Sequence, residues 1–256
     1  MIDNFPKIKL GNVKIFAGSK ISFFEINKKV LFSKESESLV ISSTSVHGII
    51  EAQDDKKYED ILNQSFLLNP DGKPLSLLGR ILGEQDIEQI RGPDVLPEIC
   101  NITANSNLKH FFYGGKEGVA DKLAESLINN NPELSVSGTF CPPFRELSTK
   151  EMDDIAKIIN ETKTDIVWVG LSTPKQEKWA SEIRKRIKVK AIYTVGAAFD
   201  FEIGLVKPAP SWIAKIYLEW LYRILKEPRR LLARYLKIIP KFVYISINEI
   251  LKNKFS

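Results

Sequence analysis

The chain has 256 residues, 43% of them hydrophobic, and carries a formal net charge of +5. This length and hydrophobic content exclude a disordered chain and suit one large domain, or one domain with an appendage. Two cysteines without CxxC spacing and two histidines argue against a disulfide framework or a Cys/His zinc site. No apolar run approaches the ~18 residues of a spanning helix and no signal peptide is evident, so we expect a cytoplasmic protein.

The N-terminal part, from Ile8 to Val40, is predicted to form short strands with turns at Gly11, Gly18 and Lys28–Lys29. We expect these strands to make a hairpin, spanning about residues 1–38, that packs on the core. The residues of this part suggest no chemistry of their own.

Short apolar runs, each followed by a helix-like segment, recur through the middle of the chain. The expected strands are 39–42, 110–113, 165–170 and 191–195, and the helix-like stretches are 47–63, 119–129 and 176–186. This alternation predicts an α/β fold, with a Rossmann-like, mainly parallel sheet and flanking helices over residues 1–209. The composition changes near 208–210, and a basic amphipathic helical appendage is predicted over 210–256.

Loops at the carboxyl ends of parallel strands gather into one crevice, where open α/β sheets bind ligands. The residues expected there are Thr44, Gly114, Gly115, Lys175, Gln176 and Asp200. Gly114 and Gly115 stand where a strand gives way to a helix, so backbone N–H groups can approach a phosphate without a Cβ in the way. A tight turn without a ligand explains the same glycines equally well, because the full GxGxxG pattern is missing.

A second motif is the string Asn69-Pro70-Asp71-Gly72, whose residue types also favour an ordinary turn. Further along the chain, the string Arg91-Gly92-Pro93-Asp94 supplies an arginine for anion binding. A general base at Asp71 beside an anion site at Arg91 suits a sugar transfer, in which an acceptor hydroxyl loses its proton while a diphosphate leaves.

Two other loops follow predicted strands. The loop over 170–177 carries Lys175 and Gln176, whose side chains suit contact with a ligand at the sheet's carboxyl edge. The same residues also suit the ordinary start of a helix. Gly196 and the small residues after it permit close backbone approach, with Asp200 directly behind them. Close packing of a strand against a helix explains these small residues as well.

The appendage holds ten of the chain's Lys and Arg residues but three acidic ones. Its apolar residues recur at three- and four-residue steps, which predicts a first helix up to Lys226 and a second helix from Pro228 that stops at Pro240. A basic helix with Trp and Leu on its other face is typical of an interfacial membrane helix, with Trp212 and Trp220 at the lipid. The same stripe also suits packing on the domain.

The arginines of the appendage outnumber the acidic residues available to pair with them along the helices. Arginine forks bind phosphate bidentately, so Arg223, Arg229 and Arg230 suit a diphosphate in a nucleotide-sugar or in a lipid head group.

Eight strings occur in the order and spacing of the WecG/TagA/CpsF family of bacterial glycosyltransferases. They are VHGIIEAQ, NPDGKP, RGPDVLP, FFYGGKEGV, CPPFREL, VWVGLSTPKQEKW, VGAAFDF and LEWLYRILKEPRRLLARYL. The chain resembles this family from about Leu39 to Val243. The resemblance implies an inverting transferase that moves an N-acetylhexosamine-type sugar, such as N-acetylmannosamine, from a UDP-sugar to a polyprenyl-diphosphate-linked acceptor. It further implies cell-surface polysaccharide synthesis, peripheral binding to the inner face of the membrane through 210–256, and no metal or other cofactor.

Carried over by position, the resemblance implies Asp71 as the general base and Gln176 as a catalytic residue, with the family's Thr at Thr44 or Ser42. It implies that Arg223, Arg229 and Arg230 close over the nucleotide diphosphate. Arg91 completes the expected catalytic set. The other expected substrate-binding residues are His47, Asn69, Gly72, Asp94, Tyr113, Gly114, Gly115, Gly170, Lys175, Gly196 and Asp200.

The chain departs from the family pattern at one position. Family members commonly carry an arginine where this chain has Gln89, three residues before the glycine of the Gly-Pro-Asp string. Either Arg91 takes over the anion contact, or this branch handles its donor differently.

Two other functions compete with the transferase hypothesis. A non-enzymatic basic module would bind membrane or nucleic acid through its tail by charge alone; on the transferase hypothesis we expect no nucleic-acid partner. A nicotinamide-dependent oxidoreductase is disfavoured because the glycines at 114, 115 and 118 lack the full dinucleotide fingerprint. An exposed face on the tail also allows a homo-oligomer.

Overall fold

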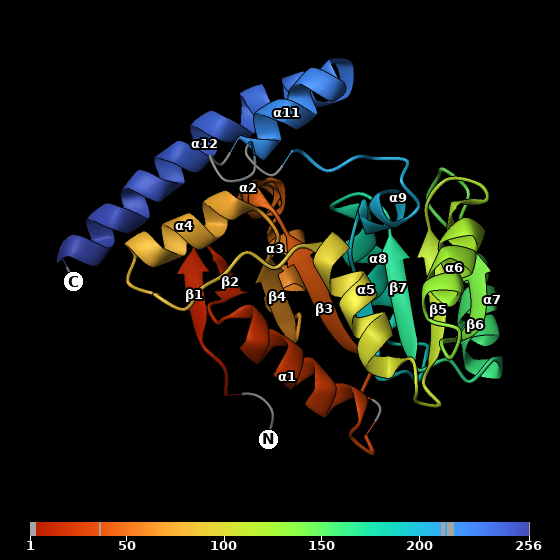
Figure 1. The fold of residues 1–256 in the computed structure, drawn as a ribbon. Coiled ribbons are helices and arrows are strands. Elements are labelled where there is room, and N and C mark those ends of the chain that lie inside the picture. Colours follow the sequence, from red (N-terminus) through yellow and green to blue (C-terminus); the bar gives the residue numbers. More distant parts are fainter. Residues whose placement is uncertain (1–3, 36, 211–212, 214–217, 256) are drawn as a thin grey trace.

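A six-stranded parallel sheet forms the centre of the molecule (Figure 1). The computed structural model describes residues 4–35, 37–210, 213 and 218–255. The sheet order is β4, β3, β8, β7, β5, β6, with all neighbours parallel. The strands are β3 (Leu39–Thr44), β4 (Leu67–Pro70), β5 (Lys109–Gly114), β6 (Ser135–Phe140), β7 (Ile166–Gly170) and β8 (Ala191–Thr194). The predicted Rossmann-like α/β fold is confirmed.

The central strands are apolar on both faces because helices cover both sides of the sheet. Side chains alternate along each strand. Phe112 of β5 and Trp168 of β7 enter the core on one face, whereas Phe111 and Val167 enter the core on the other. Trp168 stacks on Tyr193 of β8 with ring centroids 4.5 Å apart.

Three groups of helices surround the sheet (Figure 1). One face packs against α1 (Lys20–Leu31), α5 (Gly92–Thr103), α6 (Val119–Asn130) and α9 (Ala198–Glu202). The opposite face packs against α7 (Thr149–Glu161) and α8 (Lys175–Ile183). A third core cluster joins α2 (Val46–Asp54), α3 (Lys56–Asn63) and α4 (Lys73–Ile81) to the hairpin of β1 (Lys7–Leu10) and β2 (Val13–Phe16).

The N-terminal prediction is only partly correct. β1 and β2 form the expected antiparallel hairpin, but residues 20–31 form helix α1 instead of further strands. Ser19 caps this helix by accepting the N–H of Ser22 at 3.2 Å. Phe23 and Val30 then fall on the face that packs into the core, so an N-cap and a 3.6-residue period outweigh the turn-like Lys28–Lys29 pair.

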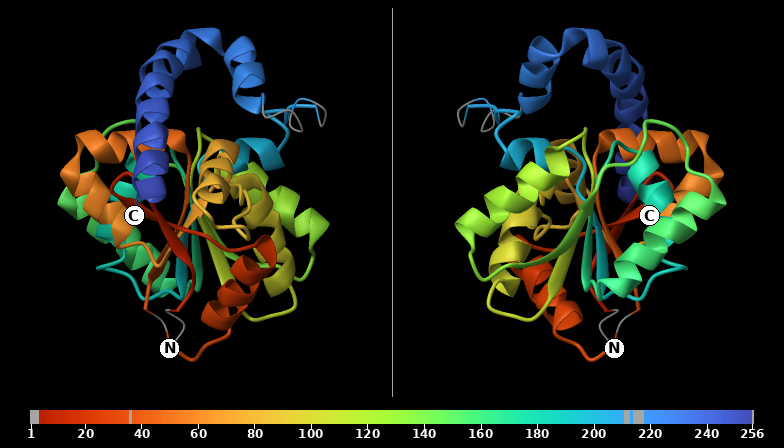
Figure 2. Two further views of the ribbon diagram at one scale, coloured as in Figure 1. Left: turned by 90° about the vertical axis from the view of Figure 1, so that its left-hand side faces the viewer. Right: turned by 90° about the vertical axis from the view of Figure 1, so that its right-hand side faces the viewer.

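The C-terminal appendage arches over the carboxyl edge of the sheet (Figure 2). It contains α11 (Glu219–Lys226) and α12 (Pro228–Phe255). The prediction that the second helix stops at Pro240 is wrong, since α12 continues through this proline. Ile238 is buried just before it and Phe242 packs on the third core cluster just after it, so tertiary packing outweighs the local cost of a helical proline.

The domain boundary at residue 209 remains a prediction. The predicted lipid contact of Trp212 falls on a residue outside the described part of the chain. Among the described residues, none of the helices has the length and hydrophobicity of a membrane-spanning segment.

Candidate active site

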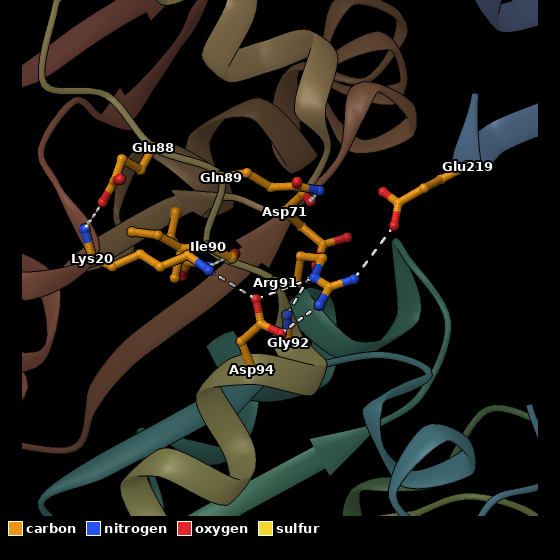
Figure 3. Close-up of polar contacts among 10 residues, drawn as sticks. Lys20, Asp71, Glu88, Gln89, Ile90, Arg91, Gly92, Asp94 and Glu219 are labelled. Carbon is orange, nitrogen blue, oxygen red and sulfur yellow. Dashed lines mark hydrogen bonds and ion pairs between the residues drawn. The ribbon is translucent and has the colours of Figure 1, made fainter. Parts of the chain in front are cut away.

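Asp71 lies at the carboxyl edge of the sheet, directly after the last residue of β4. Its backbone N–H donates to the carbonyl of Thr44, at the end of β3, over 2.7 Å. Its side chain is half-buried and is surrounded by residues from three separate parts of the chain (Figure 3). The predicted base is therefore held where ligands bind in open α/β sheets.

The carboxylate of Asp71 meets the N-terminus of α5. Its Oδ1 accepts the backbone N–H of Gly92, the first residue of that helix, at 2.9 Å. The first N–H groups of a helix have no acceptor within the helix, and they favour a negative charge. A Cβ at position 92 would lie 2.5 Å from the carbonyl oxygen of Val195, so this close approach of α5 to the end of β8 requires glycine.

The surroundings of Asp71 make it a stronger base than a solvated aspartate. Burial raises the pKa of Asp71 above its ordinary value. The Gly92 N–H and the charges of Arg223 and Arg91 favour the ionised form, but they do not cancel the effect of burial. A carboxylate with a raised pKa accepts a proton more readily at neutral pH, as general-base catalysis requires.

Arg91 lies between two carboxylates, one from the domain and one from the appendage (Figure 3). Its guanidinium binds both oxygens of Asp94, through Nη2 at 2.6 Å and Nε at 3.1 Å. Its Nη1 lies 3.4 Å from Oε1 of Glu219 in α11. Burial alone would raise the pKa of Asp94, but the hydrogen bonds and charges of Arg91 and Lys20 outweigh it and hold that pKa below the ordinary value.

The site contains a second guanidinium group besides that of Arg91, and it belongs to Arg223 of α11. Its charge is one of the influences that lower the pKa of Asp71, and its Cζ lies 6.0 Å from the ring centre of Phe201. Its Nε is buried and makes no hydrogen bond within the described structure. A buried guanidinium N–H without an acceptor is suited to an anion. Arg229 lies exposed near the start of α12, and the side chain of Arg230 is outside the described part.

The glycine turn after β5 lies beside the end of β7. Gly114 and Gly115 adopt φ angles of 122° and 76°, and the N–H of Gly115 donates to the carbonyl of Gly170 at 2.9 Å. A Cβ at Gly114 would lie 2.6 Å from that same carbonyl oxygen. Backbone geometry alone therefore requires these glycines, and the turn lies at the edge where a phosphate is expected.

Gln176 is buried behind the site, with only 2% of its surface exposed. Its Oε1 accepts the N–H of Gly196 at 2.9 Å, and its Nε2 donates to Oε1 of Glu177 at 2.9 Å. Thr173 also donates to Glu177, at 3.0 Å. Burial raises the pKa of Glu177. In this conformation the amide of Gln176 supports the turn after β8.

Like Gln176, the predicted site residues Ser42, Thr44, Asn69 and Tyr113 have buried side chains. Thr44 packs against α2, where a Cβ at Gly48 would lie 2.3 Å from its hydroxyl oxygen. Ser42 lines a small pocket beside Glu177. Tyr113 stacks on Trp179 with ring centroids 3.8 Å apart, and Phe140 stacks on its ring at 5.8 Å. Thr44 contributes to the site through its backbone carbonyl, which holds Asp71.

Ser43 is a residue that the sequence interpretation missed. It is partly exposed, unlike Ser42 and Thr44 on either side of it. Its hydroxyl accepts Nδ2 of the buried Asn69 at 2.9 Å, which links β3 to the residue two positions before Asp71. Strand alternation could have shown that Ser43 and its neighbours face opposite sides, but the sequence does not say which side borders the site.

The remaining predicted residues are spread along the carboxyl edge. Gly72 precedes α4, and Gly196 adopts a φ of 59° after β8. Lys175 begins α8, with its ammonium 4.5 Å from the ring centre of Phe144, and Asp200 lies in α9. His47 lies in α2 and faces α12; burial and the charge of Arg234 lower its pKa, although Glu51 opposes them.

The carboxylates around Asp71 are paired with basic side chains instead of being grouped together. Among the described residues, no group of three or more His, Cys, Asp or Glu side chains is arranged to hold a metal ion. The described structure brings together the carboxylate of Asp71, the guanidinium groups of Arg91 and Arg223, and the glycine turn at 114–115.

Known proteins are similar to this chain over most of its length. A sequence model described as the glycosyl transferase WecG/TagA/CpsF family matches residues 8–256. The N-acetylglucosaminyldiphosphoundecaprenol N-acetyl-beta-D-mannosaminyltransferase of Bacillus subtilis (strain 168) is 28% identical over 213 residues, covering 82% of this chain and 79% of that protein. The enzyme of the same name from Bacillus spizizenii is 25% identical and covers 89% of this chain and 86% of its own length. The one from Staphylococcus aureus (strain MRSA252) is 26% identical and covers 85% of this chain and 84% of its own length.

Proposed function

Because the chain belongs to the WecG/TagA/CpsF family of glycosyl transferases, we propose that it transfers an N-acetylhexosamine from a UDP-sugar to a sugar carried on a polyprenyl diphosphate. N-acetylmannosamine is the first candidate for the donor sugar, since the named relatives are N-acetyl-beta-D-mannosaminyltransferases acting on an N-acetylglucosaminyldiphosphoundecaprenol. Family membership sets aside the oxidoreductase and the non-enzymatic basic module.

Asp71 starts the proposed reaction by taking the proton of the acceptor hydroxyl. The acceptor oxygen then attacks the anomeric carbon of the donor sugar from the face opposite the diphosphate. The bond from that carbon to the diphosphate oxygen breaks, UDP leaves with the electron pair, and the configuration inverts. The single observation that carries this role is the Asp71 carboxylate at the carboxyl edge of the sheet, which accepts the N–H of Gly92 and has a raised pKa.

The departing diphosphate needs positive charge that is already in position. We assign this task to Arg223, whose Nε is buried without an acceptor, and to Arg91, which is next to Asp94. The glycine turn at 114–115 offers backbone N–H groups to the phosphates. Arg229 and Arg230 are proposed to approach when the appendage closes on the donor.

The appendage is also proposed to bind a membrane surface. The outward face of α12 carries exposed apolar residues at steps of three and four, namely Leu232, Leu236, Ile239, Val243, Ile247 and Leu251. This outer apolar stripe is flanked by basic residues, including Arg229 and Lys237, both exposed. A helix with these two faces lies at the boundary between head groups and acyl chains, which is where the lipid-linked acceptor is found.

The test is a transfer assay with UDP-N-acetylmannosamine, other UDP-sugars and a prenyl-diphosphate-linked N-acetylglucosamine acceptor. Asp71→Asn keeps the shape of the side chain but removes its basicity, so transfer should fall by at least ~10³-fold while UDP binding remains. Asp86→Asn, at an exposed position, is the matched control and should transfer at the wild-type rate. Retained turnover in Asp71→Asn removes Asp71 from the role of base.

A further inference from the structure

Gln89 directs its side-chain amide toward the backbone of Asp71 (Figure 3). Its Nε2 donates to the carbonyl oxygen of Asp71 at 2.8 Å. The N–H of Asp71 is held by Thr44 at 2.7 Å, and its carboxylate accepts the N–H of Gly92 at 2.9 Å. The N–H, the carbonyl and the carboxylate of Asp71 are therefore all fixed by hydrogen bonds. Thr44 and Gly92 contribute backbone groups to these bonds, whereas Gln89 contributes its side chain.

The chain on either side of Gln89 is anchored, which sets the position of its amide. Glu88 accepts the backbone N–H of Lys20, at the start of α1, at 2.7 Å. Ile90 donates its N–H to the carbonyl of Pro70 at 2.8 Å. With both neighbours held, the Gln89 side chain reaches Asp71 at a small cost in conformational entropy.

We propose that Gln89 is a positioning residue for the base: its amide fixes the Asp71 backbone so that the carboxylate stays at the acceptor hydroxyl. This inference rests on the proposed function, because it takes Asp71 to be the base. A displacement of about 1 Å at a reacting group can cost roughly 10²-fold in rate. One hydrogen bond at this position therefore has a larger effect on turnover than on stability.

The absence of charge on Gln89 is part of the argument. An arginine at position 89 would also donate N–H groups to the Asp71 carbonyl, but its charge would stabilise the carboxylate and lower the pKa of Asp71. Burial raises that pKa, and a neutral amide fixes the loop without opposing this effect. Gln89 thus holds the base in place and leaves it basic, while Arg91 supplies positive charge nearby.

The experiment compares three variants by steady-state transfer, UDP binding and pH profile. Gln89→Leu removes the hydrogen-bond donor with little change in side-chain size. We expect kcat to fall ~10- to 100-fold, while the KM values for donor and acceptor stay within about 3-fold of wild type. The number of UDP molecules bound per protein should not change. Gln89→Arg restores a donor, so it should keep kcat within roughly 5-fold of wild type on the alkaline side, with the acid limb of its profile moved to lower pH. Gln85→Leu, at an exposed position in the same segment, should match wild type.

Three results would overturn the proposal. The first is a wild-type kcat in Gln89→Leu. The second is equal loss of rate in the leucine and arginine variants, since the arginine retains N–H donors. The third is a fall in the number of UDP sites that equals the fall in rate, because a merely structural residue gives that result. Should Asp71→Asn remain inactive while Gln89→Leu is fully active, the inference fails and the proposed function stands.

Discussion

At the scale of single residues, Asp71 links the structure to a pH dependence. Burial raises its pKa, so the folded chain binds this proton more tightly than the unfolded chain does. Ionisation of Asp71 therefore costs folding free energy at neutral pH, and that cost disappears as the pH falls below the raised pKa. On the proposed function, activity has the opposite dependence, because only the ionised carboxylate accepts the proton of the acceptor.

Arg223 should determine where the acid limb of the activity profile lies. Its positive charge lowers the pKa of Asp71, so Arg223→Met should move the acid limb of kcat/KM to higher pH. The same variant loses a diphosphate contact, and kcat should fall by roughly 10²-fold. A full pH profile checks both effects. Lys226→Met removes an exposed charge from the same helix and should leave the limb in place; an equal shift in both variants would point to general charge instead of Arg223.

The sequence indicated Asp71 as a candidate base through the nearby Arg91 string and through the family resemblance, and that role stays a prediction. The structure adds that Asp71 directly follows β4 at the carboxyl edge of the sheet. The choice between Ser42, Ser43 and Thr44 depends on which face of β3 borders the site, and that face is set by distant helices. The N–H of Gly92 was missed because the Gly-Pro-Asp string was not interpreted as a helix start, although proline in the first turn is a known signal.

At the scale of elements, the appendage is joined to the domain by polar contacts and by a buried apolar face. Lys241 pairs with Asp54 of α2, and Glu219 of α11 pairs with Arg91. These ion pairs are partly exposed and each contributes at most ~1 kcal/mol. Ile238 is only 4% exposed, so the buried face of α12 contributes more to docking than its charges do.

Two adjacent residues in α12 allow this docking to be tested. Ile238→Asp places a charge on the buried face, and we expect α12 to separate from α2 while the sheet stays folded. Hydrogen exchange should then increase throughout 228–255 and remain at the wild-type level in β5, β7 and β8. Ile239 is 39% exposed, so Ile239→Asp is the matched control and should exchange like wild type. Uniform protection in Ile238→Asp would mean that other contacts hold the appendage.

The elements that the sequence predicted correctly are those whose pattern is local. β5, β7 and β8 are apolar runs ending in glycine or a small residue, and their positions were predicted within one or two residues. The passage of α12 through Pro240 could not be predicted, because the packing of Ile238 and Phe242 that offsets the proline comes from residues far away in the sequence. Helix α1 was missed for another reason, since its cap at Ser19 was present in the sequence but was given too little weight.

At the scale of the whole molecule, charge is unevenly distributed. Residues 210–256 carry ten basic and three acidic residues, or +7, which leaves −2 for residues 1–209 out of the total of +5. On the proposed membrane binding, this uneven charge orients the appendage toward an anionic surface. The outer apolar stripe lies on that same appendage.

Vesicles provide the test of membrane binding. The protein should co-sediment with vesicles containing anionic phospholipid, and less so at high salt, because part of the attraction is electrostatic. The double variant Leu236→Asp/Ile247→Asp places charges in the outer apolar stripe and should reduce binding at least ~10-fold. Ile158→Asp alters a comparably exposed residue of α7, far from the appendage, and should bind like wild type. Equal binding by the double variant and wild type would exclude this face as the contact.

The strand order also determines when the site can assemble during synthesis. β3 and β4 are made early, but the central partner of β3 is β8, whose residues leave the ribosome well over a hundred positions later. Until then β3 lacks a neighbour on that side, and an unpaired strand edge favours aggregation. Asp71 acquires its final surroundings only after Val195 and α11 have emerged. On the proposed function, a nascent chain therefore lacks a positioned base until α11 has been made.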